Sequence, residues 1–268
     1  MATAAEQLTL KRIDEWQAGA GQLPREASLC RELLKLQIDA AARFAPQAVC
    51  LDTSVIAAKA EAGEPLLTFD DVAIDWALLE HLYGKAGNLL EVPADDATDL
   101  KALARGWFDG AEPDAGTNRL AAMGASLKPF LAARREALQQ AIPQEAWRRG
   151  YCPVCGGMPD FAYLDAERGE RWLVCSRCDA EWLFQRLECA FCGNRDQNTL
   201  AYFADEQAQY RLYVCERCRC YLKAIDLRKS GSKTFLPVER VLTLDMDVQA
   251  RQNGYCRPAA CNRLDPDG

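Results

Sequence analysis

The sequence has a single histidine, His81, among its 268 residues, and it has no long hydrophobic run. One imidazole cannot build a histidine-rich metal site or a pair of imidazole acid–base catalysts. No stretch approaches the roughly 20 apolar residues that cross a bilayer, and residues 1–12 lack the basic start and apolar run of a signal peptide. A glycine-rich phosphate-binding loop is also missing. These absences predict a cytoplasmic protein without membrane insertion and with little catalytic equipment.

Positive charge is also in short supply. The chain has 32 Lys and Arg residues against 39 Asp and Glu residues, which gives a formal net charge of −7. A molecule with this balance repels polyphosphate, so we expect no nucleic-acid partner. The remaining composition is ordinary for a globular chain, with 49% hydrophobic and 26% charged residues, and it predicts one or two compact domains.

Cysteine is the residue in excess. The chain has 13 cysteines, of which only Cys30 and Cys50 fall in the first 150 residues. The others lie between Cys152 and Cys261. In a reducing compartment, such a cluster favours a metal framework over a set of disulfides. We expect Cys30 and Cys50 to be small buried hydrophobes.

The half of the chain before residue 146 is rich in Ala, Leu, Glu, Arg and Gln, which are good helix formers. An apolar stripe with helical spacing predicts a helix between Pro24 and Phe44. A second stripe predicts a helix after Asp70 and Asp71, which can cap its start. His81 would lie on this helix as a packed or surface residue. Further helices are expected at residues 5–17, 95–108, 117–125 and 127–141.

Four Cys-x-x-Cys pairs follow in the second half: Cys152 and Cys155, Cys175 and Cys178, Cys189 and Cys192, and Cys215 and Cys218. In order they form C-x2-C-x19-C-x2-C and then C-x2-C-x22-C-x2-C. Both intervals suit a hairpin that folds one pair back onto the other and completes a tetrahedral four-sulfur site. The eight cysteines are therefore predicted to bind two metal ions. Zinc and iron both accept four thiolates, so the ligand type leaves the metal open.

The two cysteine units repeat each other beyond the cysteines. Arg171-Trp-Leu-Val-Cys175-Ser-Arg-Cys178 matches Arg211-Leu-Tyr-Val-Cys215-Glu-Arg-Cys218, and a glycine follows the first pair of each unit, as Gly156 or Gly193. Glycine permits the positive φ that turns backbone amides toward the sulfurs. Each unit has only about 30 residues, too few for an apolar core alone, so metal coordination must stabilise it.

The predicted fold class is α+β. A helical N-terminal domain (1–146) precedes two tandem rubredoxin-like or zinc-ribbon four-cysteine modules (147–187 and 188–235), and the C-terminal tail (236–268) is expected to be partly helical. Aromatic residues flank the cysteine pairs; they would either form the small cores around the metals or face a partner. The metals could be purely structural. The roles of Cys220, Cys256 and Cys261 stay open, and we expect none of them to be a metal ligand.

The pattern Cys152-Pro-Val-Cys155-Gly, Leu173-Val-Cys175-Ser-Arg-Cys178, Cys189-x-x-Cys192-Gly and Cys215-x-x-Cys218, with Gly63-Glu-Pro-Leu-Leu67 in the helical half, resembles the formate dehydrogenase accessory protein family, FdhE. The resemblance implies a non-enzymatic, cytoplasmic maturation factor that binds the catalytic subunit of a respiratory formate dehydrogenase before export. It also implies rubredoxin-like iron sites, with the eight paired cysteines as ligands, and so favours iron over zinc.

Two other functions compete with this interpretation. A four-thiolate iron site could transfer electrons or sense oxidants, which would make the chain a rubredoxin-like redox protein. Zinc ribbons also bind nucleic acid, although the acidic charge balance disfavours that role. Whether the chain forms a homodimer is left open.

Overall fold

The computed structural model describes residues 7–8, 10–15, 25–43, 52–93, 99–110, 116–142, 144–230 and 234–257. The chain divides into two compact units, Met1–Val49 with Leu67–Ala137, and Cys50–Leu66 with Leu138–Gly268. Residues 50–66 are thus grouped with the cysteine-rich half and not with the helical residues on either side of them. The domain boundaries predicted at 146, 187 and 235 stay predictions.

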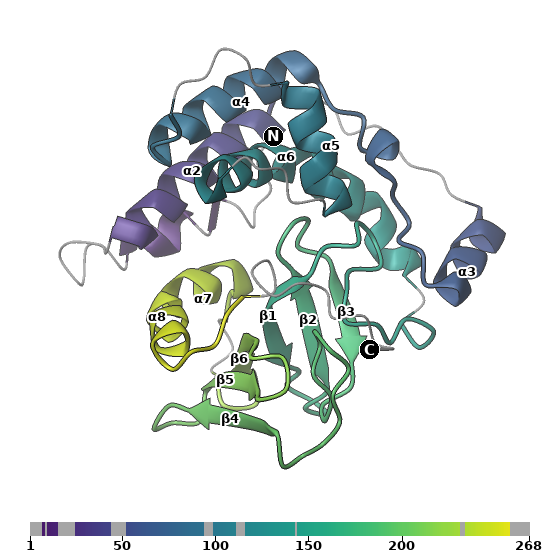
Figure 1. Cartoon of the computed structure of the whole chain (residues 1–268), viewed down its shortest axis with the longest axis vertical. Coiled ribbons are helices and arrows are strands. Elements are labelled where there is room, and N and C mark those ends of the chain that lie inside the picture. The colour runs from purple at the N-terminus through teal and green to yellow at the C-terminus, as the bar shows by residue number, and fades with distance from the viewer. Residues whose placement is uncertain are drawn as a thin grey trace. The chain divides into compact units, whose positions relative to one another are not determined.

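The first unit is built of helices, which Figure 1 labels. They are α2 (Arg25–Ala41), the 3-10 helix η1 (Phe69–Val72), α4 (Trp76–Leu89), α5 (Leu100–Asp109) and α6 (Thr117–Leu138). The helix predicted between Pro24 and Phe44 is confirmed as α2, which contacts α4. The described residues within 5–17 are also helical. Phe69 packs edge-to-face on Phe108 with 5.7 Å between the ring centroids, so η1 is fastened to α5.

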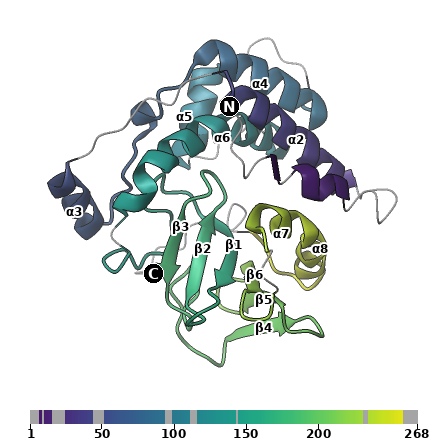
Figure 2. The same cartoon turned by 180° about the vertical axis from the view of Figure 1, so that it is seen from behind.

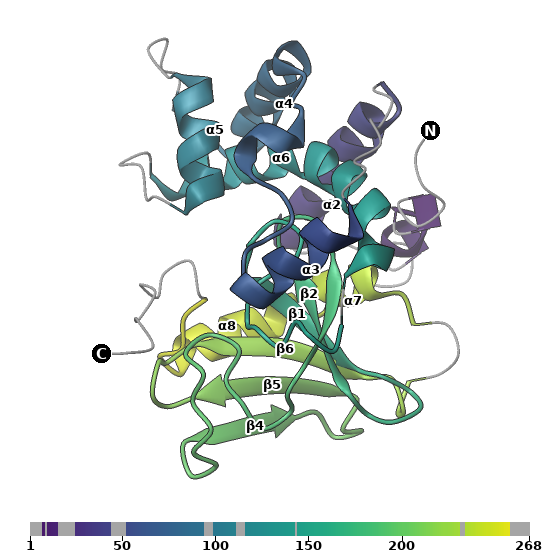
Figure 3. The ribbon, with the colours of Figure 1, turned by 90° about the vertical axis from the view of Figure 1, so that its right-hand side faces the viewer.

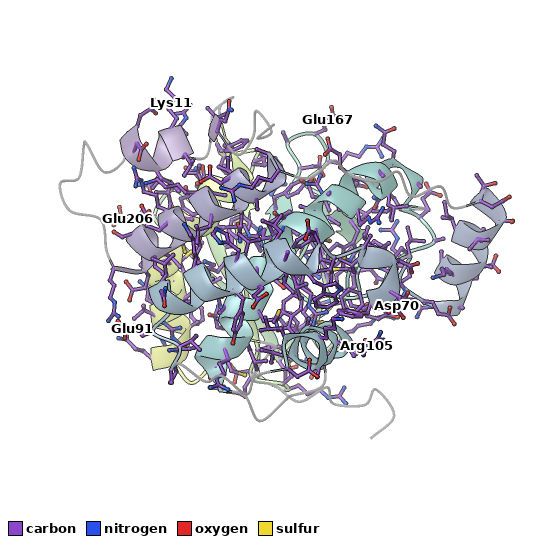
Figure 4. The ribbon with its side chains drawn as sticks, turned by 90° about the horizontal axis from the view of Figure 1, so that it is seen from above. Lys11, Asp70, Glu91, Arg105, Glu167 and Glu206 are labelled. Atoms are coloured by element: carbon purple, nitrogen blue, oxygen red, sulfur yellow. The ribbon has the colours of Figure 1, made fainter. Side chains whose placement is uncertain are left out.

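The predicted cap of α4 is wrong. The helix begins at Trp76, and the carboxylate of Asp75 caps it by accepting a hydrogen bond from the Leu78 N–H at 3.1 Å. Asp71 does not cap α4, because its carboxylate accepts a hydrogen bond from the backbone N–H of Thr68 at 2.7 Å, at the start of η1. Asp70 points to Arg105, 2.5 Å away between the nearest charged atoms, as Figure 4 shows.

Residues 117–138 form one helix, α6, where two helices were expected at 117–125 and 127–141. Pro129 lies inside this helix and has no N–H for the carbonyl of Ala125, four residues before it. The Nε2 amide of Gln37 in α2 donates to that carbonyl at 3.0 Å. A hydrogen bond from the neighbouring helix thus replaces the missing one, and the helix continues.

The second unit contains six strands, β1 (Pro159–Leu164), β2 (Arg171–Cys175), β3 (Glu181–Phe184), β4 (Leu200–Ala204), β5 (Tyr210–Cys215) and β6 (Tyr221–Asp226). Each cysteine unit is an antiparallel meander of three strands. The meanders join because β1 pairs in parallel with β6, with Phe161 opposite Lys223. The result is one six-stranded sheet in the order β3-β2-β1-β6-β5-β4, seen from behind in Figure 2. The α+β class is confirmed, and this joining of the two modules was not foreseen.

Helices flank the sheet within the same unit. They are α3 (Thr53–Ala62), which the sequence analysis missed, the 3-10 helix η2 (Gln139–Ala141), α7 (Leu236–Leu242) and α8 (Leu244–Gln252). The ammonium of Lys223 on β6 lies 2.7 Å from the carboxylate of Asp247 on α8, and both side chains are buried. Arg240 on α7 donates to the carbonyl of Cys175 at 3.1 Å. The C-terminal helices therefore contact both meanders. No helix among the described residues has the length and apolar character needed to cross a membrane.

Candidate metal centres

The first four-cysteine cluster is Cys152, Cys155, Cys175 and Cys178, and all four side chains are buried. Its Sγ atoms lie within 4.8 Å of one another. The distance is 3.6 Å from Cys152 to Cys178 and 3.6 Å from Cys155 to Cys175. The turn before β1 supplies one pair of sulfurs, and the turn between β2 and β3 supplies the other.

The second cluster repeats this arrangement with Cys189, Cys192, Cys215 and Cys218. Its Sγ atoms are 3.7 Å apart between Cys189 and Cys218 and 3.8 Å apart between Cys192 and Cys215. Cys192 and Cys218 are half-buried, whereas the other two are buried. The eight cysteines named from the sequence are thus brought together as two quartets in the predicted combination.

Both quartets have the geometry of a tetrahedral metal site. Metal–sulfur bonds of about 2.3 Å place the sulfurs of a regular tetrahedron about 3.8 Å apart. Burial raises the pKa of Cys152 well above its ordinary value, and burial also raises the pKa of Cys192 to about 11. Four thiolates held this closely therefore require a compensating cation. Each cluster could hold one metal ion. Iron and zinc both bind four thiolates in this geometry.

The turns that carry the sulfurs follow one backbone plan. In the first module, the N–H of Gly156 donates to the carbonyl of Cys152 at 3.0 Å; in the second, Gly193 donates to Cys189 at 3.0 Å. The two glycines have φ of 71° and 66°, as the sequence predicted. Within the first cluster, the N–H of Val154 lies 3.3 Å from the sulfur of Cys152. Such contacts stabilise negative charge on sulfur.

Asn194 is a contributor that the sequence analysis missed. Its side-chain amide is buried and donates to the sulfur of Cys215 at 3.5 Å and to the hydroxyl of Thr199 at 2.8 Å. The corresponding residue of the first module is Gly157, where a Cβ atom would lie 3.0 Å from the sulfur of Cys175. A comparison of the two repeats could have revealed this difference, since Cys155-Gly-Gly aligns with Cys192-Gly-Asn.

The segment before residue 67 contacts the first cluster. The N–H of Leu66 donates to the carbonyl of Pro153 at 2.8 Å, inside the Cys152–Cys155 turn. The hydroxyl of Tyr151 donates to the carbonyl of Gly63 at 2.7 Å. Residues 63–66, which were noted only as part of a family pattern, thus help to cover the first cluster.

The other described cysteines lie outside the two quartets. Cys30 is only half-buried, in contrast to the buried position predicted, while Cys50 and Cys261 lie outside the described residues. Cys220 is buried, and its backbone forms an isolated parallel bridge with Cys256. Cys256 is disulfide-bonded, so it offers no thiolate. His81 is exposed on α4.

Comparison with known proteins identifies a family match and several relatives. Residues 151–186 match the family described as "FdhE, central domain". An FdhE homolog of Aquifex aeolicus is 36% identical over 117 residues, which cover 42% of this chain and 41% of that protein. An FdhE homolog of Shewanella oneidensis is 34% identical over 110 residues, which cover 40% of this chain and 36% of that protein. These matches span less than half the length of either relative.

A solved structure is similar in fold to nearly the whole chain. The crystal structure of the FdhE protein from Pseudomonas aeruginosa matches with a TM-score of 0.61 and covers 99% of this chain and 96% of that one. Its sequence identity is 24%, so this comparison shows a shared fold. The resemblance to the FdhE family that the cysteine spacing indicated is confirmed by the central-domain match, the relatives and the shared fold together.

Proposed function

We propose that this chain is a formate dehydrogenase accessory protein. In this role it is not an enzyme; it binds the catalytic subunit of a respiratory formate dehydrogenase in the cytoplasm and supports its assembly or activation before export. The observation that carries the proposal is the match of residues 151–186 to the FdhE central domain, which spans the whole first cysteine cluster.

The proposed role of the eight cysteines is to hold two metal ions as thiolates. A divalent ion at each cluster would supply the cross-link that a three-stranded meander of this size needs in order to stay folded. We favour iron on the strength of the family resemblance and keep zinc as the alternative. The protein's own residues orient the sulfurs through the backbone turns at Gly156 and Gly193 and the amide of Asn194.

A pull-down tests the proposed partner. The tagged full chain is expressed in cells that make a respiratory formate dehydrogenase, and the catalytic subunit should be retained at near-equal molar ratio. A variant with Cys155→Ser and Cys192→Ser should retain much less of the subunit, because both modules would lose their metal. Absence of the subunit from the wild-type eluate would reject the proposal.

A redox role is the second candidate, and the exposure of the second cluster favours it. Cys192 and Cys218 are only half-buried, and a site that exchanges electrons must come close to the surface. Mass spectrometry and visible absorption of anaerobically purified protein separate the candidates. A reversible absorbance change on reduction supports a redox function, whereas a colourless protein with two zinc ions per chain rejects it.

A further inference from the structure

The strand β4 lies at one end of the sheet, and its outer edge is open, as Figure 3 shows. The N–H of Asp205 donates to the carbonyl of Tyr210 at 3.2 Å. This bond shows which residues of β4 direct their backbone groups toward β5. Because antiparallel hydrogen bonds alternate, residues 200, 202 and 204 direct their N–H and C=O groups away from β5. Within the described ranges these outward groups have no hydrogen-bond partner.

The opposite end of the sheet, at β3, is closed by glutamine side chains. The Oε1 atom of Gln139 accepts from the N–H of Glu181 at 3.2 Å, and its Nε2 atom donates to the carbonyl of the same residue at 2.9 Å. The Oε1 atom of Gln144 accepts from the N–H of Leu183 at 3.0 Å. Side-chain amides thus take the place of a further strand at β3, and no described residue covers β4 in this way.

Large apolar side chains are exposed beside the open edge. Leu187 is 63% exposed, Tyr202 53% and Phe203 58%. A cavity of about 220 Å³ lies against the sheet at β4, β5 and β6 and reaches residues 200–202 of the edge strand. It is lined by residues 186–191 of the loop before β4 and by strand residues that include Tyr202 and Tyr213. An apolar cavity beside an unpaired strand is the arrangement with which proteins bind an extended peptide.

The internal repeat places an additional arginine beside this cavity, which is also lined by Glu188 and by Cys189 and Cys215 of the second cluster. Arg171 and Arg211 stand at equivalent positions, each four residues before a cysteine ligand. In the second module, Arg211 forms an ion pair with the buried carboxylate of Asp226 at 2.6 Å. Arg171 lies opposite Phe184 in the first meander, and Arg211 lies opposite Ala224 in the second. Two residues further along, Arg186 therefore corresponds to Asp226. The first module therefore has a second arginine where the other has an aspartate.

Among the described residues, neither Arg171 nor Arg186 forms an ion pair with a carboxylate, although Arg171 lies near the charges of Glu188 and Cys189. Arg171 is buried and donates to the carbonyl of Glu188 at 2.5 Å. Arg186 is exposed, and both side chains line the cavity. The nearby carboxylate of Glu188 pairs with Arg195 at 2.7 Å. An acidic group from outside the chain would complete the ion pair that Asp226 provides in the second module.

We propose that β4 and the adjoining cavity bind an extended acidic segment of a partner polypeptide. The segment adds to the open edge as a further strand, one of its apolar side chains enters the cavity, and an Asp or Glu side chain pairs with Arg186. This inference rests on the proposed function, because the segment would belong to the formate dehydrogenase catalytic subunit.

The test uses overlapping synthetic peptides of about 15 residues, long enough to add as a strand, that cover the sequence of that catalytic subunit. The immobilised peptides are probed with the full chain, with Arg186→Glu, and with Arg168→Glu as the control. Arg168 is exposed in the β1–β2 turn and does not line the cavity. We expect the wild type to bind peptides in which an acidic residue lies next to apolar residues.

The Arg186→Glu variant should bind these peptides at least about tenfold more weakly, and Arg168→Glu should bind as the wild type does. Replacing the peptide's acidic residue by Lys should restore binding to Arg186→Glu. Equal binding by all three proteins, or no acidic peptide bound by the wild type, would overturn the inference. If intact catalytic subunit is still retained in that case, only this site is rejected; if it is not, the proposed function fails as well.

Discussion

At the scale of single residues, the two sulfur quartets differ in exposure but share their geometry. Each takes two cysteines from each of its two Cys-x-x-Cys turns, and sulfurs from opposite turns lie at a distance that a single ion can bridge. Because four sulfurs would share one ion, the loss of one sulfur should weaken the whole site and leave three thiolates close together. The effect of a cysteine substitution should therefore stay within its own cluster.

Substituting one cysteine in each cluster tests this independence. Cys155→Ser and Cys192→Ser should each lower the metal content from two ions per chain to about one, because a hydroxyl is a poor replacement for a thiolate. Cys30→Ser, outside both clusters, should leave two. Metal analysis by mass spectrometry gives the counts. Unchanged metal in either cluster variant would contradict the assignment of those ligands.

A buried tyrosine predicts a specific loss of stability at high pH. The hydroxyl of Tyr163 donates to the Glu181 carboxylate at 2.7 Å, and burial, aided by that carboxylate, raises its pKa far above the ordinary value of 10.0. The folded protein therefore keeps this proton after the unfolded chain has released it. The stabilisation is complete below pH 10 and is lost as pH rises toward the folded pKa.

Denaturant unfolding of the wild type and Tyr163→Phe measures this contribution. The difference in unfolding free energy between them should be constant from about pH 7 to 9 and should shrink above pH 10 by up to about 1.4 kcal/mol per pH unit. Thiolates are favoured in this range, so the metals remain bound. A constant difference up to pH 11 would show that Tyr163 ionises equally easily in both states.

At the scale of elements, α6 depends on a side chain from another helix. Gln37→Ala should remove the donor to the Ala125 carbonyl and destabilise the helical unit by about 1 to 3 kcal/mol. Pro129→Ala in the same background restores a backbone N–H and should recover most of that loss. Thermal unfolding of the four proteins in this cycle measures the coupling. Equal effects of Gln37→Ala with and without Pro129 would show that the two residues act independently.

The sequence was sufficient to predict those elements that residues close together in the chain determine. Helical spacing predicted α2, and the cysteine intervals predicted both quartets, because coordination requires those sulfurs to meet whatever the rest of the chain does. It was insufficient where a residue far away in the chain determines how an element begins, continues or pairs. The continuity of α6 depends on Gln37, the start of α4 depends on Thr68 engaging Asp71, and the joining of the meanders depends on β1 meeting β6.

At the scale of the whole molecule, the two units should respond differently to metal removal. Both four-cysteine clusters belong to the cysteine-rich unit, where they accompany its apolar cores, and none of their cysteines belongs to the helical unit. A chelator should empty the half-exposed second cluster before the buried first one. Cys192→Ser should lack the fast phase of metal release, and Cys155→Ser should lack the slow phase.

Hydrogen exchange with mass spectrometry follows the structural result of that treatment. Amides of β1–β6 should lose protection when the metals are removed, and amides of α2 and α6 should keep theirs. Loss of protection in both units at once would show that the helical unit depends on the metals. Retained protection of the strands would show that the sheet folds without them.

The parallel pairing of β1 with β6 has a consequence for synthesis of the chain. On the ribosome, the first meander is complete when Phe184 has been made, yet β1 stays uncovered until Asp226 emerges. During that interval the nascent protein displays a bare strand next to freshly assembled sulfur ligands. The order of translation thus creates a vulnerable period in which premature pairing with another nascent copy competes with correct closure.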